Sequence, residues 1–293
     1  MTRTINNIKT YISRCIRFIL LGQPKVYANI SQLSPNDFLK GRTAIITGGT
    51  SGIGFEIAKA FINAGAFVVI TGRKQEKIQA ACTTINNSSF HKDRILGVEM
   101  DNMVIQNLEN KFHEILSKLN HKKIDILVNN AGVIGGHISN TTEEEYDKVL
   151  NTNLKAVFFF SKIVGKYFKE NNIKGNILNI ASSSSLRPAV SAYTISKWGV
   201  RGLTLGLAKA LAPYGITVNG LAPGQTATPM LGRTEKDDIS SPKIPIGRYA
   251  LPQEIANMAV ILVSDMGRTI MGDIVYMTGG AGVFSNDDMD YSF

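Results

Sequence analysis

The chain of 293 residues has few of the residues that mark disulfide-stabilised, metal-binding or membrane-spanning proteins. Its two cysteines, Cys15 and Cys82, cannot form a disulfide framework, so the fold does not depend on an oxidising compartment. Neither cysteine has closely spaced Cys or His neighbours and the four histidines are scattered, so we predict no metal site. No apolar run approaches the roughly 20 residues that span a bilayer. We therefore expect a globular chain that works in the cytoplasm.

The net charge of +9 is concentrated at one end of the chain. Residues 1–35 contain five basic residues and no acidic one, which leaves a mild positive charge on the rest. The chain also has no nucleic-acid-binding signature and no run that interleaves aromatic and basic residues. We therefore predict no nucleic-acid partner.

Residues 1–38 are predicted to form a basic, amphipathic N-terminal extension. Isoleucines recur on one side at helical spacing and arginines fall on the other side, at Ile5, Ile8, Ile12, Ile16 and Ile19 and at Arg3, Arg14 and Arg17. Three interpretations stay open: peripheral contact with an anionic membrane surface, a cleaved transit peptide, or a helix that docks on the domain or on a neighbouring subunit.

From Thr43 onward, short apolar runs alternate with longer segments of helical periodicity. The predicted strands are 43–47, 67–71, 95–101, 124–129, 175–180, 216–221 and 273–277. The predicted helices are 53–64, 75–86, 104–119, 143–170, 192–213 and 252–265. Seven strands with helical crossovers predict an α/β fold, a doubly wound parallel seven-stranded Rossmann-like sheet, in a single domain over 39–293. Residues 225–250 are predicted to form a lid, because loops of that length usually cover a binding site.

A glycine-rich turn, Gly48-x-x-x-Gly52-x-Gly54, follows the first predicted strand and opens the first helix. Glycines at such a turn allow a pyrophosphate to approach backbone N–H groups at the positive end of a helix. The second strand ends in Arg73 and lacks the acidic residue that would hold a ribose 2′-hydroxyl. A guanidinium suits a 2′-phosphate, so we predict NADP as the cofactor in preference to NAD.

Tyr193 and Lys197 are four residues apart in a predicted helix and therefore lie on one face of it. A free tyrosine has a pKa of about 10 and is a poor acid–base catalyst near neutral pH. A nearby ammonium favours the phenolate, so this pair is a candidate for proton transfer.

Several motifs occur together in the order and spacing of one known family. They are the glycine turn, Asn129-Asn130-Ala131-Gly132, Asn153, Ser182, Tyr193-x-x-x-Lys197 and Pro223-Gly224. From about Leu39 to Gly280 the chain resembles short-chain dehydrogenases/reductases, in the single-domain branch that contains 3-oxoacyl-carrier-protein reductases and sugar and alcohol dehydrogenases. The resemblance implies an oxidoreductase that transfers a hydride between NADP(H) and a carbonyl or secondary alcohol.

The resemblance also implies residue roles. Tyr193 would be the acid or base, Lys197 would lower its pKa, Ser182 would hydrogen-bond the substrate oxygen, and Asn153 would hold a relay water. The implied cofactor-binding residues are Gly48, Thr50, Ser51, Gly52, Ile53, Gly54, Arg73, Asp101, Asn129, Ala131, Gly132, Tyr193, Lys197, Pro223, Gly224, Thr226 and Thr228. We expect Arg187, Pro188, Ala189 and the predicted lid to line the substrate pocket.

The chain departs from the family pattern at two places, and other interpretations stay open. The interval between Ser182 and Tyr193 is slightly short, so Ser183 is an alternative catalytic serine, and Thr278 stands where many relatives carry Asp. An epimerase or dehydratase of the same superfamily, and a catalytically idle NADP-binding protein, are the alternative functions. Gly199, Gly202 and Gly206 recur along the Tyr193 helix, which in this family packs between subunits, so we predict a homodimer or homotetramer.

Overall fold

The computed structural model describes residues 37–120, 122–234 and 236–283, so nearly all of the predicted extension lies outside the described residues. Seven strands form one parallel sheet in the order β3-β2-β1-β4-β5-β6-β7. The strands are β1 Thr43–Thr47, β2 Phe67–Gly72, β3 Ile95–Glu99, β4 Ile126–Asn129, β5 Asn176–Ile180, β6 Thr217–Pro223 and β7 Ile274–Met277. This order confirms the predicted doubly wound Rossmann-like fold.

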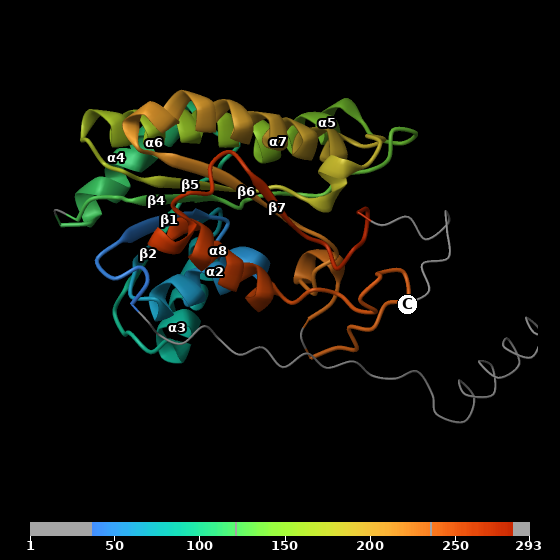
Figure 1. Cartoon of the computed structure of the whole chain (residues 1–293), viewed down its shortest axis with the longest axis horizontal. Helices are drawn as coiled ribbons and strands as arrows, with labels where there is room; N and C mark the ends of the chain where they lie inside the picture. Colours follow the sequence, from blue (N-terminus) through green and yellow to red (C-terminus); the bar gives the residue numbers. More distant parts are fainter. Residues whose placement is uncertain (1–36, 121, 235, 284–293) are drawn as a thin grey trace, which may run out of the picture.

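Helices cover both faces of the sheet (Figure 1). On one face lie α4 Leu108–Lys118, α5 Glu143–Leu150, α6 Ala156–Glu170 and α7 Ala192–Leu211, and on the other lie α2 Gly52–Asn63, α3 Gln75–Ser88 and α8 Pro252–Val263. From β1 the chain adds β2 and β3 on one side of the sheet, and it then returns to add β4 on the other side of β1. The direction of strand addition therefore reverses between β1 and β4. Ligands of such sheets bind beyond the carboxyl ends of the strands at this reversal.

Two apolar layers hold the helices to the sheet, and side chains of one strand alternate between them. Ile46 of β1 belongs to the buried cluster that contains Phe61 of α2, while its neighbour Ile45 belongs to the cluster that contains Phe160 of α6. All five residues of β1 are buried. The continuous apolar runs of the sequence therefore correspond to strands that are covered on both faces.

The predicted helix 143–170 is interrupted in the structure. α5 ends at Leu150, a π-helical turn spans Asn151–Lys155, and α6 starts at Ala156. Apolar periodicity does not reveal the break, because a single π turn displaces the helical phase by only one residue. The turn places Asn153, a predicted catalytic residue, at the interruption.

The segment predicted as a lid, residues 225–250, lies beyond the carboxyl end of β6 and has its own small core. Ala227, Ile239 and Leu251 are buried together, with Tyr249 packed against them. A backbone bridge pairs Thr226 with Ala250. The segment is therefore anchored at both ends, and its opening and closing stay a prediction.

In the described part of the chain no helix has the length and apolar character needed to cross a membrane.

Candidate active site

A cavity of about 480 Å³ opens at the carboxyl edge of the sheet. Its wall is made from the segments that follow six strands: 48–53 after β1, 72–73 after β2, 100–103 after β3, 130–134 after β4, 180–184 after β5 and 223–231 after β6. Residues from distant parts of the sequence therefore meet in one site, at the place where the strand order predicts a ligand.

The glycine turn forms the floor of this cavity at the start of α2. Gly48 and Gly52 adopt φ values of 65° and 57°, the left-handed region that other residues rarely occupy. A Cβ atom on Gly48 would also lie 2.8 Å from the Cα atom of Ala131. The turn therefore tolerates no side chain at Gly48, and the first turn of α2 stays open to the cavity.

Gly54 belongs to the same motif but lies behind the cavity wall. A Cβ atom there would lie 2.6 Å from the carbonyl oxygen of Gly48 and would collide with the amide of Asn130. That amide donates hydrogen bonds to the carbonyl oxygens of Thr47 at 2.9 Å and Gly48 at 3.0 Å. Gly54 thus makes room for Asn130, a member of the Asn129-Asn130-Ala131-Gly132 motif that lines the cavity.

Arg73 and Asp101 lie at the end of the cavity formed by the segments after β2 and β3. The guanidinium of Arg73 is exposed and has no hydrogen-bond or ion-pair partner among the described residues. A carboxylate oxygen of Asp101 accepts a hydrogen bond of 2.9 Å from the N–H of Met103, which shapes the turn after β3. Both predicted residues are therefore placed to contact a ligand in this half of the cavity.

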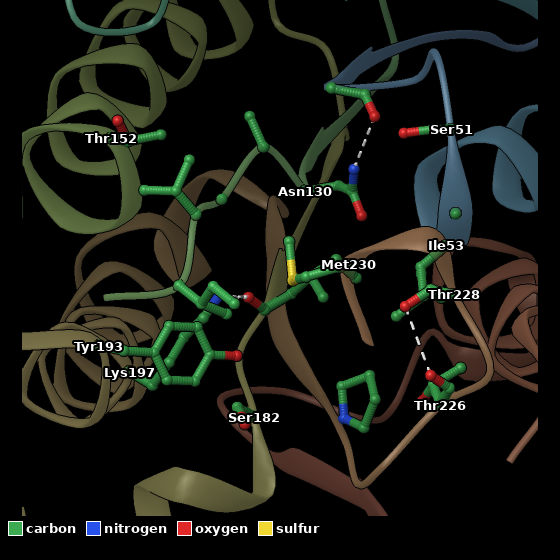
Figure 2. A pocket seen from close by; sticks show the side chains of 18 of the residues that line it. Ser51, Ile53, Asn130, Thr152, Ser182, Tyr193, Lys197, Thr226, Thr228 and Met230 are labelled. Carbon is green, nitrogen blue, oxygen red and sulfur yellow. Dashed lines mark hydrogen bonds between the residues drawn. The ribbon is translucent and has the colours of Figure 1, made fainter. Parts of the chain in front are cut away.

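Ser182, Tyr193 and Lys197 lie together at the opposite end, as Figure 2 shows. Ser182 follows β5, and the other two lie on successive turns of α7 with their side chains toward the cavity. The ammonium nitrogen of Lys197 lies 5.7 Å from the centroid of the Tyr193 ring and donates a hydrogen bond of 2.7 Å to the carbonyl oxygen of Ile180. The structure therefore brings the three predicted side chains into one cluster.

Burial shifts the pKa values of both titratable groups in this cluster. It lowers the pKa of Lys197 to about 8, since the ammonium loses its hydration. It raises the pKa of Tyr193, and the hydrogen bond from Ser182 opposes that increase. The sequence suggested Lys197 as the group that acidifies the phenol; in the structure the opposing contact comes from Ser182.

Ser182 and Ser183 both line the cavity, and their contacts distinguish them. The hydroxyl of Ser182 accepts a hydrogen bond of 3.1 Å from the N–H of Ser184 and also contacts the phenol of Tyr193. Ser183 begins the short 3₁₀ helix Ser183–Leu186 and has no such contact with the phenol. The geometry favours Ser182 over the alternative Ser183.

Asn153 is buried and does not line the cavity. Its side-chain oxygen accepts a hydrogen bond of 2.8 Å from the N–H of Val133, and its amide donates to the Val133 carbonyl oxygen and to the hydroxyl of Ser196. The Asn153 side chain thus ties the π-helical turn to the segment after β4 and to the first turns of α7, which carry Tyr193 and Lys197.

Asn129 lies at the end of β4, also behind the cavity wall. Its amide donates hydrogen bonds of 2.9 Å to Ser161 and 2.8 Å to Asn179, and the Asn179 amide donates 2.9 Å to Thr204 of α7. This buried chain fixes α6 and α7 against the strand ends. The family resemblance implied that Asn129 binds the cofactor; the contacts that the structure shows for its side chain are with Ser161 and Asn179.

The segment after β6 closes the remaining side of the cavity. Pro223, Gly224, Thr226 and Thr228 all line it, and the Thr228 methyl lies 3.5 Å from the position of a Cβ on Gly52. A Cβ on Gly224 would lie 2.8 Å from the Cα of Thr278, the residue that departs from the family pattern. The remaining predicted residues Thr50, Ser51, Ile53, Ala131 and Gly132 also line the cavity, as does Arg187, whereas Pro188 and Ala189 do not.

These features define a class: doubly wound α/β proteins with a glycine turn and a tyrosine–lysine pair at the carboxyl edge of the sheet. The family model described as short chain dehydrogenase matches residues 42–239. The chain therefore belongs to the short-chain dehydrogenase/reductase family and is an oxidoreductase of carbonyl and alcohol groups. The predicted family resemblance is confirmed.

Curated and solved relatives agree with this assignment. A 3alpha-hydroxysteroid dehydrogenase of Mediterraneibacter gnavus is 35% identical over 253 residues, which covers 83% of this chain and 98% of the relative. The solved 3-ketoacyl-(acyl-carrier-protein) reductase of Brucella melitensis, complexed with NADH, is 32% identical with a TM-score of 0.75, covering 83% and 99% of the two chains. A Burkholderia cenocepacia short chain dehydrogenase in complex with NADP is 30% identical with a TM-score of 0.72, covering 83% and 98%.

Proposed function

We propose that this protein is an NADP(H)-dependent oxidoreductase in which Ser182, Tyr193 and Lys197 act on a carbonyl or secondary alcohol. The observation that carries the proposal is that these three side chains meet at one end of a cavity whose other end holds Arg73. The solved relatives complexed with NADH and NADP support a nicotinamide dinucleotide as the ligand that spans the two ends.

The residues of the cavity fit such a cofactor. The first turn of α2 offers backbone N–H groups beside a turn that excludes a side chain at Gly48, which suits a pyrophosphate. Lys197 has three donors, and only one hydrogen bond to a described residue is present, at the Ile180 carbonyl oxygen. The other two are free for ribose hydroxyls. Pro223, Gly224, Thr226 and Thr228 would then hold the nicotinamide end.

Arg73 supports NADP in preference to NAD. Its guanidinium is exposed at the cavity rim and is not neutralised by any described carboxylate. A guanidinium can form two parallel hydrogen bonds to a phosphate, whereas a ribose hydroxyl gives it no opposite charge to bind. We therefore assign the 2′-phosphate of NADP to Arg73.

In the reducing direction NADPH, once bound, would supply the hydride that the carbonyl carbon accepts. Tyr193 donates its phenolic proton to the carbonyl oxygen, which becomes the hydroxyl of the product. Ser182 donates a hydrogen bond to the same oxygen and stabilises the negative charge that develops there. The ammonium of Lys197 favours the phenolate that remains on Tyr193. Oxidation uses the same groups in reverse.

Asn153 acts in this proposal as a positioning residue. Its side-chain atoms are engaged by Val133 and Ser196, so they hold the π-helical turn instead of touching a ligand. A relay water beside Lys197 would then bind to the backbone of the turn. Asn129, equally engaged, positions α7 through Asn179 and Thr204.

We also propose self-association through the outer face of α7. A Cβ on Gly202 or Gly206 would meet nothing within 4 Å, whereas one on Gly199 would meet Leu154 of the same chain. Leu205 and Trp198 are half-exposed on the same helix. Such a face of small and apolar residues lets a second helix approach closely.

Contact of residues 1–38 with a membrane surface stays a separate prediction, which deletion of the extension and a vesicle-binding assay would test.

The decisive experiment measures oxidation of NADPH with a panel of carbonyl compounds. Tyr193→Phe should abolish turnover while cofactor binding, followed by calorimetry, persists. Tyr214→Phe is the matched control, because Tyr214 is exposed at the far end of α7 and does not line the cavity. Full turnover by the Tyr193→Phe protein would show that the mechanism is wrong.

A further inference from the structure

Arg187 is a second arginine on the cavity wall, at the end opposite Arg73. It follows the 3₁₀ helix Ser183–Leu186, which starts directly after Ser182. Arg187 is exposed, and its guanidinium has no hydrogen-bond or ion-pair partner among the described residues. It rests against the backbone at Gly282, where a Cβ would lie 3.3 Å from its Nε atom. The mechanism proposed above gives it no role.

The charges on the cavity wall are distributed unevenly. Within residues 37–120, 122–234 and 236–283, the charged residues that line the cavity are Arg73, Asp101, Arg187 and Lys197. Asp101 lies in the half formed after β3, so in the half that contains Tyr193 both charged side chains are basic. An anionic group bound there meets attraction from Arg187 and no repulsion from a lining carboxylate of the described residues.

The cavity wall also includes exposed apolar side chains. Ile134 is 54% exposed, Met230 49% and Leu231 44%, and all three line the cavity. A ligand that covers them gains the free energy of burying apolar surface, at roughly 25 cal/mol per Å². The lining therefore suits a molecule with an apolar body and one negative charge.

The backbone that carries Arg187 is held in place by α7. The indole N–H of Trp198 donates a hydrogen bond of 2.8 Å to the Arg187 carbonyl oxygen, and the guanidinium of Arg201 stacks on that indole with its carbon 5.1 Å from the ring centroid. Arg201 also donates to the carbonyl oxygen of Ser185. Arg187 is thus fixed relative to the helix of Tyr193 and Lys197.

We propose that Arg187 forms an anion subsite at the catalytic end, so that the substrate carries a carboxylate or phosphate together with its carbonyl group. The proposal rests on the proposed function for the position of the reacting carbonyl. The negative charge belongs either to the substrate itself, as in an oxo acid, or to a phosphate-bearing thioester carrier.

Matched substrate pairs separate these two sources of charge. The first pair is 3-oxobutanoate and its ethyl ester, and the second is 3-oxobutanoyl-CoA and the corresponding N-acetylcysteamine thioester, each with NADPH. The wild-type protein should have the higher kcat/KM for the anionic member of one pair. Arg187→Leu should reduce that preference at least tenfold, and Arg187→Lys should retain part of it because the charge remains.

Arg268→Leu is the matched control for the loss of one positive charge. Arg268 pairs with Asp265 at 2.7 Å, beyond the end of α8, and does not line the cavity. In the Arg268→Leu protein, the ratio of kcat/KM for the anionic member of a pair to kcat/KM for the neutral member should equal the wild-type ratio. If Arg187→Leu loses the preference for 3-oxobutanoate over its ethyl ester, the negative charge belongs to the substrate itself. If it loses the preference for 3-oxobutanoyl-CoA over the N-acetylcysteamine thioester, the charge belongs to the carrier.

Binding can be measured without turnover, because Trp198 is the only tryptophan in the chain and contacts the Arg187 backbone. Titrations without cofactor, using 3-hydroxybutanoate, its ethyl ester and 3-hydroxybutanoyl-CoA, should change the tryptophan fluorescence with an anionic ligand. Arg187→Leu should raise the dissociation constant of that ligand at least tenfold.

The outcomes distinguish the subsite from the proposed function. If no carbonyl compound is turned over but Arg187→Leu still weakens anion binding, the proposed function fails and the subsite stands. If Tyr193→Phe abolishes turnover but Arg187→Leu lowers kcat/KM equally for both members of each pair, the subsite is wrong. It is also wrong if the wild type shows no anion preference in either measurement.

Discussion

The Nζ atom of Lys197 donates a hydrogen bond of 2.7 Å to the carbonyl oxygen of Ile180, at the end of β5. Lys197 is only 5% exposed, and its ammonium nitrogen lies 5.7 Å from the centroid of the Tyr193 ring. A single neutral acceptor compensates little of the lost hydration, and the pKa of Lys197 falls to about 8. Two measurable consequences follow from a buried cation that titrates so close to neutral pH.

The rate of carbonyl reduction should depend on the protonation of Lys197. The reaction needs a protonated phenol and, in our proposal, an ammonium beside it. Burial raises the pKa of Tyr193, so the phenol stays protonated and Lys197 sets the alkaline limb. We expect kcat/KM to hold a plateau below pH 8 and to fall above it, in an NADPH-linked assay. A plateau that continued to pH 10 would contradict this assignment.

The free energy of unfolding should rise with pH above about 8, where kcat/KM should fall, because both depend on the protonation of Lys197. The unfolded lysine has a pKa of 10.5 and binds its proton more tightly than the folded one, so the free energy of unfolding rises as the pH increases from about 8 to 10.5. The shift corresponds to a cost of about 3 kcal/mol at pH 7. Lys197→Met removes this cost but also removes the hydrogen bond to the Ile180 carbonyl oxygen, so the net gain in the free energy of unfolding is smaller.

We therefore expect Lys197→Met to raise the midpoint of urea unfolding at pH 7 without cofactor, and to raise it much less at pH 10. The same variant should lose turnover. Lys162→Met serves as the control, because Lys162 is exposed on α6 and its substitution should leave both midpoints nearly unchanged. A Lys197→Met protein less stable than the wild type at pH 7 would mean that the hydrogen bond outweighs the desolvation.

Arg73 should determine the choice between the two dinucleotides. Arg73→Ala removes a charge-assisted contact that is worth about 1.5–3 kcal/mol, so the KM for NADPH should rise roughly 10- to 100-fold. The KM for NADH should change little. Lys77→Ala removes the same charge from the first turns of α3 outside the cavity and is the matched control. Equal effects on both cofactors would show that Arg73 does not bind the 2′-phosphate.

The outer face of α7 should control the oligomeric state. Gly202→Leu fills open space in one chain, so it should not harm folding, but it would block a second helix packed on this face. We expect a smaller molar mass by light scattering than for the wild type, which should be a dimer or tetramer. Lys77→Leu, on the exposed side of α3, should keep the wild-type mass. A monomeric wild type would refute the proposed interface.

Local patterns in the sequence predict most of the fold but miss contacts between distant segments. The strands and most helices are visible as apolar runs and periodicities. The interruption at Asn151–Lys155 is not, because it changes the helical phase by only one residue, and the bonds between Asn153 and Val133 join segments 20 residues apart. Asn129 and Gly54 belong to recognised motifs, yet both lie behind the cavity wall, where they hold other side chains in place.

The sequence by itself determined the succession of strands and helices along the chain, the glycine turn after β1 and the spacing of Tyr193 and Lys197, because these depend on residues close together in the chain. Only the tertiary structure put Ser182, and not Ser183, in contact with the phenol of Tyr193, and left Pro188 and Ala189 out of the cavity wall that Arg187 lines. The burial that lowers the pKa of Lys197 likewise arises from β5 and α7 packing together. Hydration and contact between remote segments exist only in the folded chain, so no local pattern contains them.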